Sequence, residues 1–92
     1  MSLTFEWDPE KAARNLAKHD VSFHEAATVF GDPLAMTYFD PDHSGDEDRF
    51  LTFGHSSGGR LLVVSHTDRG HRLRIISARK ATRKERKQHE EG

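Results

Sequence analysis

The residues of this sequence best suited to chemistry are basic side chains gathered in one stretch. The segment RLRIISARKATRKER, residues 72–86, holds seven of the chain's fourteen lysines and arginines in fifteen positions, against one carboxylate, Glu85. A guanidinium stays charged at any working pH and binds a pair of phosphate oxygens through two parallel N–H donors. The stretch therefore favours contact with a nucleic-acid backbone, while a solvated and ion-paired strand face remains the alternative.

A strand over residues 71–79 would carry these arginines, and its period of two decides which of them share a face. Arg72 and Arg74 lie on one face, and the apolar residues between them point to the core. Arg79 has the opposite parity to Arg74. It joins the same site only if the strand ends near Ser77 and the chain turns.

The charge is divided unevenly along the 92 residues, although the formal net charge is only −1. Residues 1–48 contain 3 basic and 11 acidic side chains, a balance of −8, and residues 49–92 contain 11 basic and 4 acidic, a balance of +7. Either the two halves neutralise each other within a folded domain, or the basic half faces a polyanion.

Local signals place two helices early in the chain. A helix over residues 9–19 begins at an Asp-Pro pair and ends at Asp20, in the left-handed position that glycine usually takes. Ser22 and Glu25 form a capping box for a second, short helix that ends near residue 30.

Five strands and a third helix make up the rest. Alternating apolar and polar residues predict strands at 3–7, 34–39, 49–56, 60–67 and 71–79. The turns SGG and DRG join the last three as hairpins, and the run LLVV predicts that the strand over 60–67 is central. The sequence TRKE at 82–85 caps a basic C-terminal helix.

The order β-α-α-β-β-β-β-α predicts a single α+β domain over residues 1–92. Its two N-terminal helices pack on one face of a mostly antiparallel sheet. The second face is then uncovered, and we expect the site there. Arg49 and Arg60 begin neighbouring strands and extend the basic patch.

The composition excludes several kinds of protein. The chain has no cysteine, so neither a disulfide nor a thiolate metal site is available. Its seven histidines lack HxH and HExxH spacing, and His66 and His71 alone face each other across a hairpin, too few for a zinc site. We therefore expect no metal and no other cofactor. Without a membrane-length apolar segment or a signal peptide, a cytoplasmic protein with no membrane partner is expected.

Three stretches together resemble one protein family. FEWDPEKAARNLAKHDVSFHEA, DHSGDEDRFLTFG and RIISARKATRKER, in this order, resemble the BrnT toxins of bacterial type II toxin–antitoxin systems. The resemblance implies a RelE-like ribonuclease fold and growth inhibition through RNA cleavage. The residues that match are Trp7, Asp8, Lys11, Asn15, Lys18, His19, His43, Glu47, Arg49, Arg74, Ser77, Arg79 and Glu85. Asp20 stands where the family typically has glycine.

The implied reaction is attack of an RNA 2′-OH on the adjacent phosphorus. It needs a proton acceptor, stabilisation of the phosphorane and a proton for the leaving 5′-oxygen, but no metal. The expected catalytic residues are Arg74 and Arg79 on the phosphate, Lys18 or Arg49 as a helper, and His19 or Glu47 as the base. The expected RNA-binding residues are Arg72, Arg60, Lys80 and Arg83. Structural roles stay open for some of them, including a pairing of Glu47 with Arg49.

The resemblance also implies partners. A BrnA-type antitoxin with a ribbon-helix-helix domain neutralises the toxin, RNA is the substrate, and operator DNA is contacted indirectly through the antitoxin. The alternative is a non-catalytic binding module whose basic sheet face binds an antitoxin or nucleic acid and cuts nothing. Self-association of the isolated chain into a homodimer stays open.

Overall fold

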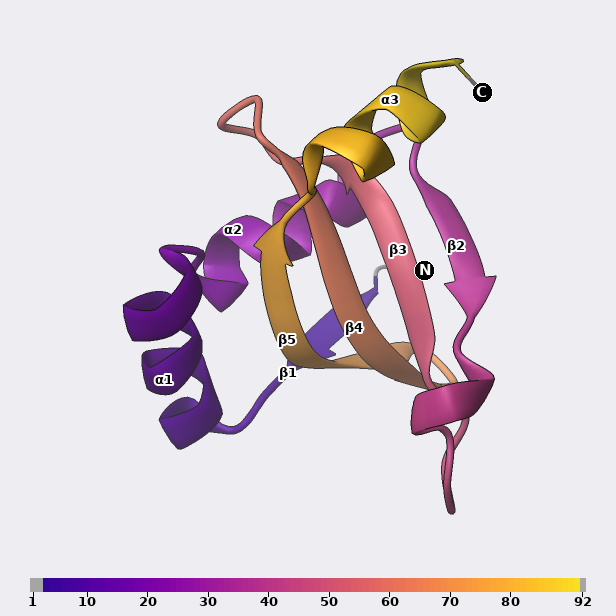
Figure 1. The fold of residues 1–92 in the computed structure, drawn as a ribbon. Coiled ribbons are helices and arrows are strands. Elements are labelled where there is room, and N and C mark those ends of the chain that lie inside the picture. Colours follow the sequence, from indigo (N-terminus) through magenta and orange to yellow (C-terminus); the bar gives the residue numbers. More distant parts are fainter. Residues whose placement is uncertain (1–2, 92) are drawn as a thin grey trace.

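A five-stranded sheet organises the chain (Figure 1). The computed structural model describes residues 3–91. The elements are β1 (Thr4–Glu6), α1 (Pro9–His19), α2 (Phe23–Thr28), the 3₁₀ turn η1 (Val29–Gly31), β2 (Met36–Phe39), the 3₁₀ turn η2 (Pro41–His43), β3 (Phe50–His55), β4 (Leu61–Arg69), β5 (Arg72–Lys80) and α3 (Arg83–Glu91).

The strand order is β1-β5-β4-β3-β2. β1 runs parallel to β5, and the other neighbours are antiparallel. The α+β class and the mostly antiparallel sheet are therefore confirmed. β4 is the middle strand, as its apolar run predicted.

The predicted cap of α2 and the predicted end of α1 are found at the expected residues. Ser22 Oγ accepts from the Glu25 N–H at 3.0 Å, and Asp20 takes a left-handed conformation with φ of 58°. The reciprocal half of the Ser22 capping box is absent among the hydrogen bonds of the described residues. Instead, the Glu25 carboxylate accepts from the Ser56 hydroxyl at 2.7 Å and from Arg60 Nε at 2.9 Å, which ties α2 to the β3–β4 hairpin.

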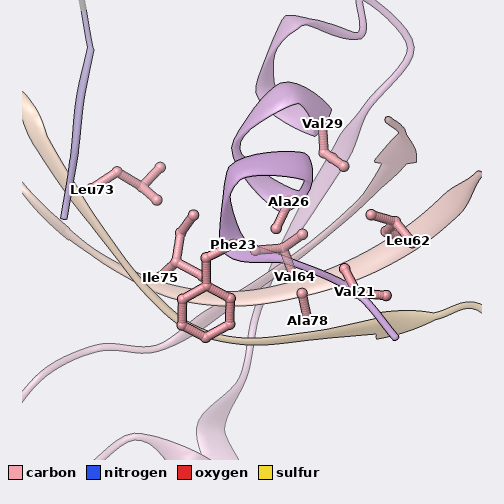
Figure 2. Packing of buried hydrophobic residues seen from close by; sticks show 9 residues of the cluster. All are labelled: Val21, Phe23, Ala26, Val29, Leu62, Val64, Leu73, Ile75 and Ala78. Atoms are coloured by element: carbon pink, nitrogen blue, oxygen red, sulfur yellow. The ribbon is translucent and has the colours of Figure 1, made fainter. Parts of the chain in front are cut away.

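The main core lies between the sheet and the helices α1 and α2 (Figure 2). It consists of Val21, Phe23, Ala26, Val29, Leu62, Val64, Leu73, Ile75 and Ala78. Burial of these side chains, at roughly 1.5–3 kcal/mol for each large one, is the main driving force for folding. α1 contributes a polar residue, because Asn15 is 7% exposed whereas Leu16 is 50% exposed.

The second face of the sheet is half covered, so the prediction of an open face is wrong. α3 crosses one end of it, above a smaller cluster of Leu61, Val63 and Ala81 with Leu51 and Phe53 packed against it. Figure 1 shows α3 lying across the ends of β4 and β3, on the side of the sheet away from α1 and α2. The other end of this face remains accessible.

The pairing of β4 with β5 contains a β-bulge. Ser65 lies opposite Ser77, whereas the next residue of β4, His66, lies opposite Ile75. Ile76 is therefore the extra residue of β5. An extra residue shifts the period of two, so the alternation of side chains reverses at this point.

The bulge brings Arg79 to the same face of the sheet as Arg72 and Arg74. Residues directly opposite each other in an antiparallel pair project to one face, and Arg79 lies opposite Val63 of the second-face cluster. β5 continues to Lys80, so the predicted end of the strand near Ser77 is wrong. Arg79 shares a face with Arg74 because of the bulge and not because the strand ends early.

A buried histidine lies on the helix side of the sheet. His66 Nε2 lies 2.7 Å from Thr52 Oγ1, and its Nδ1 lies 2.8 Å from a carboxylate oxygen of Asp68. The rings of Phe30 and Phe50 pack against it. Burial lowers the pKa of the His66 imidazole, although Asp68 acts in the opposite direction. The ring belongs to the core and does not face His71.

Acid should destabilise the fold through His66. The unfolded chain binds a proton at this histidine below its ordinary pKa of about 6.5, whereas the buried ring resists protonation. The stability contributed by the neutral ring is present above that pH and lost as the pH falls. Urea unfolding at several pH values measures this slope. His66→Gln should flatten it, and the exposed control His71→Gln should not; an unchanged slope in His66→Gln would contradict the assignment.

Candidate functional site

The accessible end of the second face holds a polar cavity of about 330 Å³. Its lining residues come from α1, from the segment between β2 and β3, and from β4 and β5. They are Lys11, His43, Gly45, Asp46, Glu47, Arg49, Thr67, Arg74 and Ile76. This cavity is called the basic pocket below. It brings together three of the predicted catalytic residues: Arg74, Arg49 and Glu47.

The two arginines of the basic pocket are held differently. Arg74 is half-buried and its Nη1 lies 3.1 Å from a carboxylate oxygen of Glu6 in β1. The backbone of Arg49 is fixed by the preceding loop, since its N–H donates to Ser44 Oγ at 2.9 Å and its carbonyl accepts from the Asp40 N–H at 2.8 Å. Within residues 3–91, the Arg49 guanidinium makes no ion pair, so its donors remain available to a ligand.

Thr67 adds a polar group to the pocket wall. The residue is 3% exposed, and its hydroxyl oxygen is buried with no hydrogen-bond partner in the described part of the chain. An unpaired buried hydroxyl costs about 1–3 kcal/mol, which an anionic ligand accepting its hydrogen would recover. Thr67 lies directly opposite Arg74, so both groups can act on the same ligand.

An imidazole lies at the rim of the basic pocket. His43 Nδ1 is 2.8 Å from a carboxylate oxygen of Asp40, whose side chain is largely buried while that of His43 is exposed. The carboxylate can only accept, so Nδ1 carries the hydrogen and Nε2 is left as a base. This pairing orients the ring, and a base oriented by a second group is one arrangement that enzymes use for proton transfer.

Glu47 is engaged by an arginine that was not among the predicted site residues. Arg69 donates to both carboxylate oxygens of Glu47, at 2.8 Å each. These bonds hold the pKa of Glu47 below its usual range, and the charges of Arg74 and Arg49 add to the effect. The structural alternative, a pair between Glu47 and Arg49, is wrong: Glu47 does form an ion pair, but with Arg69. A carboxylate so stabilised in its charged form is a poor base.

The other predicted catalytic residues lie outside the basic pocket. Lys18 and His19 are in the last turn of α1 and do not line it. Arg79 lies at the α3 end of the same sheet face, where it donates to both carboxylate oxygens of Glu85, at 2.7 and 2.9 Å. These bonds lower the pKa of Glu85 to about 2. The geometry thus separates Arg79 from Arg74.

The four predicted RNA-binding residues do not form one group. Arg72 Nε lies 3.3 Å from Glu6, close to the basic pocket. Arg60 is bound to Glu25 and to the Asp20 carbonyl, so it joins the α1–α2 turn to the hairpin. The other two are exposed at the far end of the molecule. Lys80 lies opposite Leu62 on the helix side of the sheet, and Arg83 begins α3.

The Arg79–Glu85 pair should hold α3 on the sheet. Glu85→Gln removes the carboxylate charge from a partly exposed pair worth about 1 kcal/mol. Because α3 has little apolar surface, this loss should make the amides of residues 83–91 exchange about fivefold faster with solvent. Hydrogen exchange followed by NMR measures it, with Glu90→Gln on the same helix as control. Equal exchange in both variants would mean that the Arg79–Glu85 pair does not hold α3 on the sheet.

Within residues 3–91, no group of three or more histidine and carboxylate side chains is arranged to hold a metal ion. In the same residues, no helix combines the length and the apolar composition needed to span a membrane.

The fold and the basic pocket define a small α+β protein with a polar pocket, lined by lysine and arginine side chains, on a half-covered sheet. The family model for the ribonuclease toxin BrnT of type II toxin–antitoxin systems matches residues 7–85. The chain therefore belongs to the BrnT family of ribonuclease toxins, as the sequence resemblance indicated.

A solved structure supports the fold. The chain is similar to the crystal structure of the Brucella abortus ribonuclease toxin BrnT, with a TM-score of 0.64 and 22% identity. The match covers 89% of this chain and 100% of that one. A comparison with curated proteins finds no match.

Proposed function

We propose that this chain is a metal-independent endoribonuclease and that the basic pocket is its active site. The observation that carries the proposal is the convergence of Arg49, Arg74 and Lys11 on one cavity beside the Asp40–His43 pair. The membership of the chain in a family of ribonuclease toxins supports RNA as the substrate. A single phosphodiester presents both the charge and the size that such a pocket accepts.

Arg49 and Arg74 bind the scissile phosphate and stabilise the charge of the phosphorane. Arg74, held by Glu6 before the reaction, does this without reorganising, which makes it effective. The Thr67 hydroxyl donates to a phosphate oxygen. The ion pair between Arg74 and Glu6 keeps the guanidinium in place and leaves its other nitrogens to the substrate.

His43 is the base in this mechanism. Its Nε2 takes the proton of the 2′-OH, the oxygen attacks phosphorus, and the bond to the 5′-oxygen breaks to leave a 2′,3′-cyclic phosphate. Lys11, whose ammonium group lines the same pocket, protonates the leaving oxygen. The pocket favours His43 over the predicted bases, because His19 does not line it and Arg69 occupies Glu47.

The family also bears on partners. Membership in a type II toxin–antitoxin system implies an antitoxin. We propose that it is of the BrnA type with a ribbon-helix-helix domain, that it covers the basic pocket, and that the complex contacts operator DNA through it. Unneutralised, the toxin would cleave RNA in the cytoplasm and stop growth.

Incubation of the purified chain with RNA in excess chelator tests the proposal. The parent should produce fragments that end in cyclic phosphate, and the Arg49→Ala/Arg74→Ala variant should not. Cleavage that disappears with chelator would refute metal independence. RNA that is bound but stays intact, also when translating ribosomes are supplied, would support the non-catalytic binding module instead.

A further inference from the structure

The segment between β2 and β3, residues 40–49, carries His43 but has little packing of its own. Within residues 41–48 every residue except Ser44 is exposed. Figure 1 shows this segment extending beyond the end of the sheet. A segment with so few buried contacts is held mainly by its hydrogen bonds and ion pairs. The position of His43 relative to the arginines of the basic pocket therefore depends on those contacts.

Most hydrogen bonds of this segment are internal. Ser44 Oγ accepts from the Arg49 N–H at 2.9 Å and donates to the Asp40 carbonyl at 2.7 Å. The Gly45 N–H donates to the Glu47 carbonyl at 3.3 Å. These bonds shape the segment, but they do not attach it to the rest of the protein.

One side chain attaches the segment to the sheet. Arg69, the last residue of β4, donates to both carboxylate oxygens of Glu47, at 2.8 Å each. In the described part of the chain, these are the only hydrogen bonds that join residues 41–48 to anything outside the segment. Two parallel N–H···O bonds fix the orientation of the two groups as well as their distance.

Arg69 also faces the group that holds Arg74. Its Nη1 lies 3.9 Å from a carboxylate oxygen of Glu6, and the same oxygen accepts from Arg74 Nη1 at 3.1 Å. The guanidinium of Arg69 thus contacts two carboxylates. Glu47 belongs to the segment that carries His43, and Glu6 orients Arg74. This arrangement is called the Arg69 bridge below.

We propose that Arg69 is a positioning residue, which holds His43 in place relative to Arg74 through its contacts with Glu47 and Glu6. The inference rests on the proposed function, in which His43 is the base and Arg74 binds the phosphate. Arg69 itself does not line the basic pocket, so it acts through the groups that do. A displacement of about 1 Å between reacting groups can cost about 10²-fold in rate, which makes such a bridge effective.

Breaking the bridge from either side should slow cleavage to a similar extent. Arg69→Met removes the donors and Glu47→Leu removes the acceptors. Each should lower the single-turnover rate at saturating RNA about fivefold, as expected for the loss of one partly exposed ion pair. The dissociation constant for RNA should rise in Arg69→Met and fall in Glu47→Leu, because the two changes remove opposite charges. A purely electrostatic role would not slow both variants.

Three further variants sharpen the test. Combining Arg69→Met with Glu47→Leu should cost no more than either change alone, since both break the same contact. Arg69→Lys keeps a charge and should restore part of the rate. Arg86→Met removes an exposed arginine of α3 outside the basic pocket and should keep the rate of the parent. A loss of about 10²-fold or more in Glu47→Leu alone would identify Glu47 as the base and overturn the inference.

Hydrogen exchange distinguishes this inference from the proposed function, because it needs no RNA. The amides of Ser44, Gly45 and Arg49 are hydrogen-bonded within the segment. In Arg69→Met and Glu47→Leu they should exchange about fivefold faster than in the parent and in Arg86→Met. If the parent cleaves no RNA, the proposed function fails, and faster exchange in these variants still supports the bridge. Unchanged exchange, or an unchanged rate in both variants of an active parent, would overturn the inference.

Discussion

Replacing His43 with glutamine should lower the rate of RNA cleavage by about 10²–10⁴-fold. Glutamine keeps a polar side chain of similar length but cannot accept and release the proton of the 2′-OH. Arg49 and Arg74 are untouched by the change, so the affinity for RNA should remain nearly the same. The loss should therefore appear in the single-turnover rate and not in the dissociation constant.

The matched control for this prediction is His71→Gln, an exposed histidine in the β4–β5 turn that does not line the basic pocket. A second variant, Asp40→Asn, tests the support of the ring. It keeps the shape of the carboxylate but removes the charge that favours a hydrogen on Nδ1, so it should cause a smaller loss of rate than His43→Gln. Full activity in His43→Gln would show that another group is the base.

Replacing Asn15 with alanine should lower the free energy of unfolding by about 3 kcal/mol or more. The buried side chain amide donates to the carbonyls of Val21 and Ala78, at 2.9 and 2.8 Å, and its oxygen accepts from the Ala78 N–H at 3.1 Å. Alanine would leave these backbone groups buried without partners. For a domain this small, the loss is a large part of the total stability.

The position of Asn15 explains why the effect should be so large. β1 pairs with β5 only at residues 72–74, so the later part of β5 has no neighbouring strand on that side. The amide of Asn15 presents a donor and an acceptor to Ala78 as a paired strand would. Urea unfolding of Asn15→Ala measures the cost, and Arg14→Ala, on the exposed side of α1, should change stability by less than about 0.5 kcal/mol. Similar values for both would refute this role.

Local signals predicted the fold well. The helix caps at Ser22 and Thr82 and the left-handed residue Asp20 form hydrogen bonds with residues only a few positions away. A helix end can therefore be predicted without knowing the rest of the molecule. The sheet class follows from the strand period. Nothing local, however, indicated that α3 would fold back over the sheet, where Glu85 pairs with Arg79 of β5.

The basic pocket was less predictable because it depends on distant contacts. The bulge at Ile76 is defined by the register of β5 with β4, and no sequence signal within β5 predicts it. Glu47 and Arg49 were predicted site residues, but the bond from Arg69 to Glu47 spans a hairpin and was not foreseen. His43 matched the family pattern. Its spacing from Asp40, three residues earlier on a short 3₁₀ turn, was the available signal for a proton-transferring pair.

The parallel pairing of β1 with β5 affects when the chain can fold during its synthesis. The strands β2 to β5 join neighbours in sequence, whereas β1 must pair with residues 72–74 near the other end of the chain. Contacts of such high sequence separation form late. Synthesis begins at the N-terminus, so Glu6 cannot contact Arg74 until residue 74 has been made, and the basic pocket cannot assemble before then. A ribosome that stalls early on this message would release no folded active site.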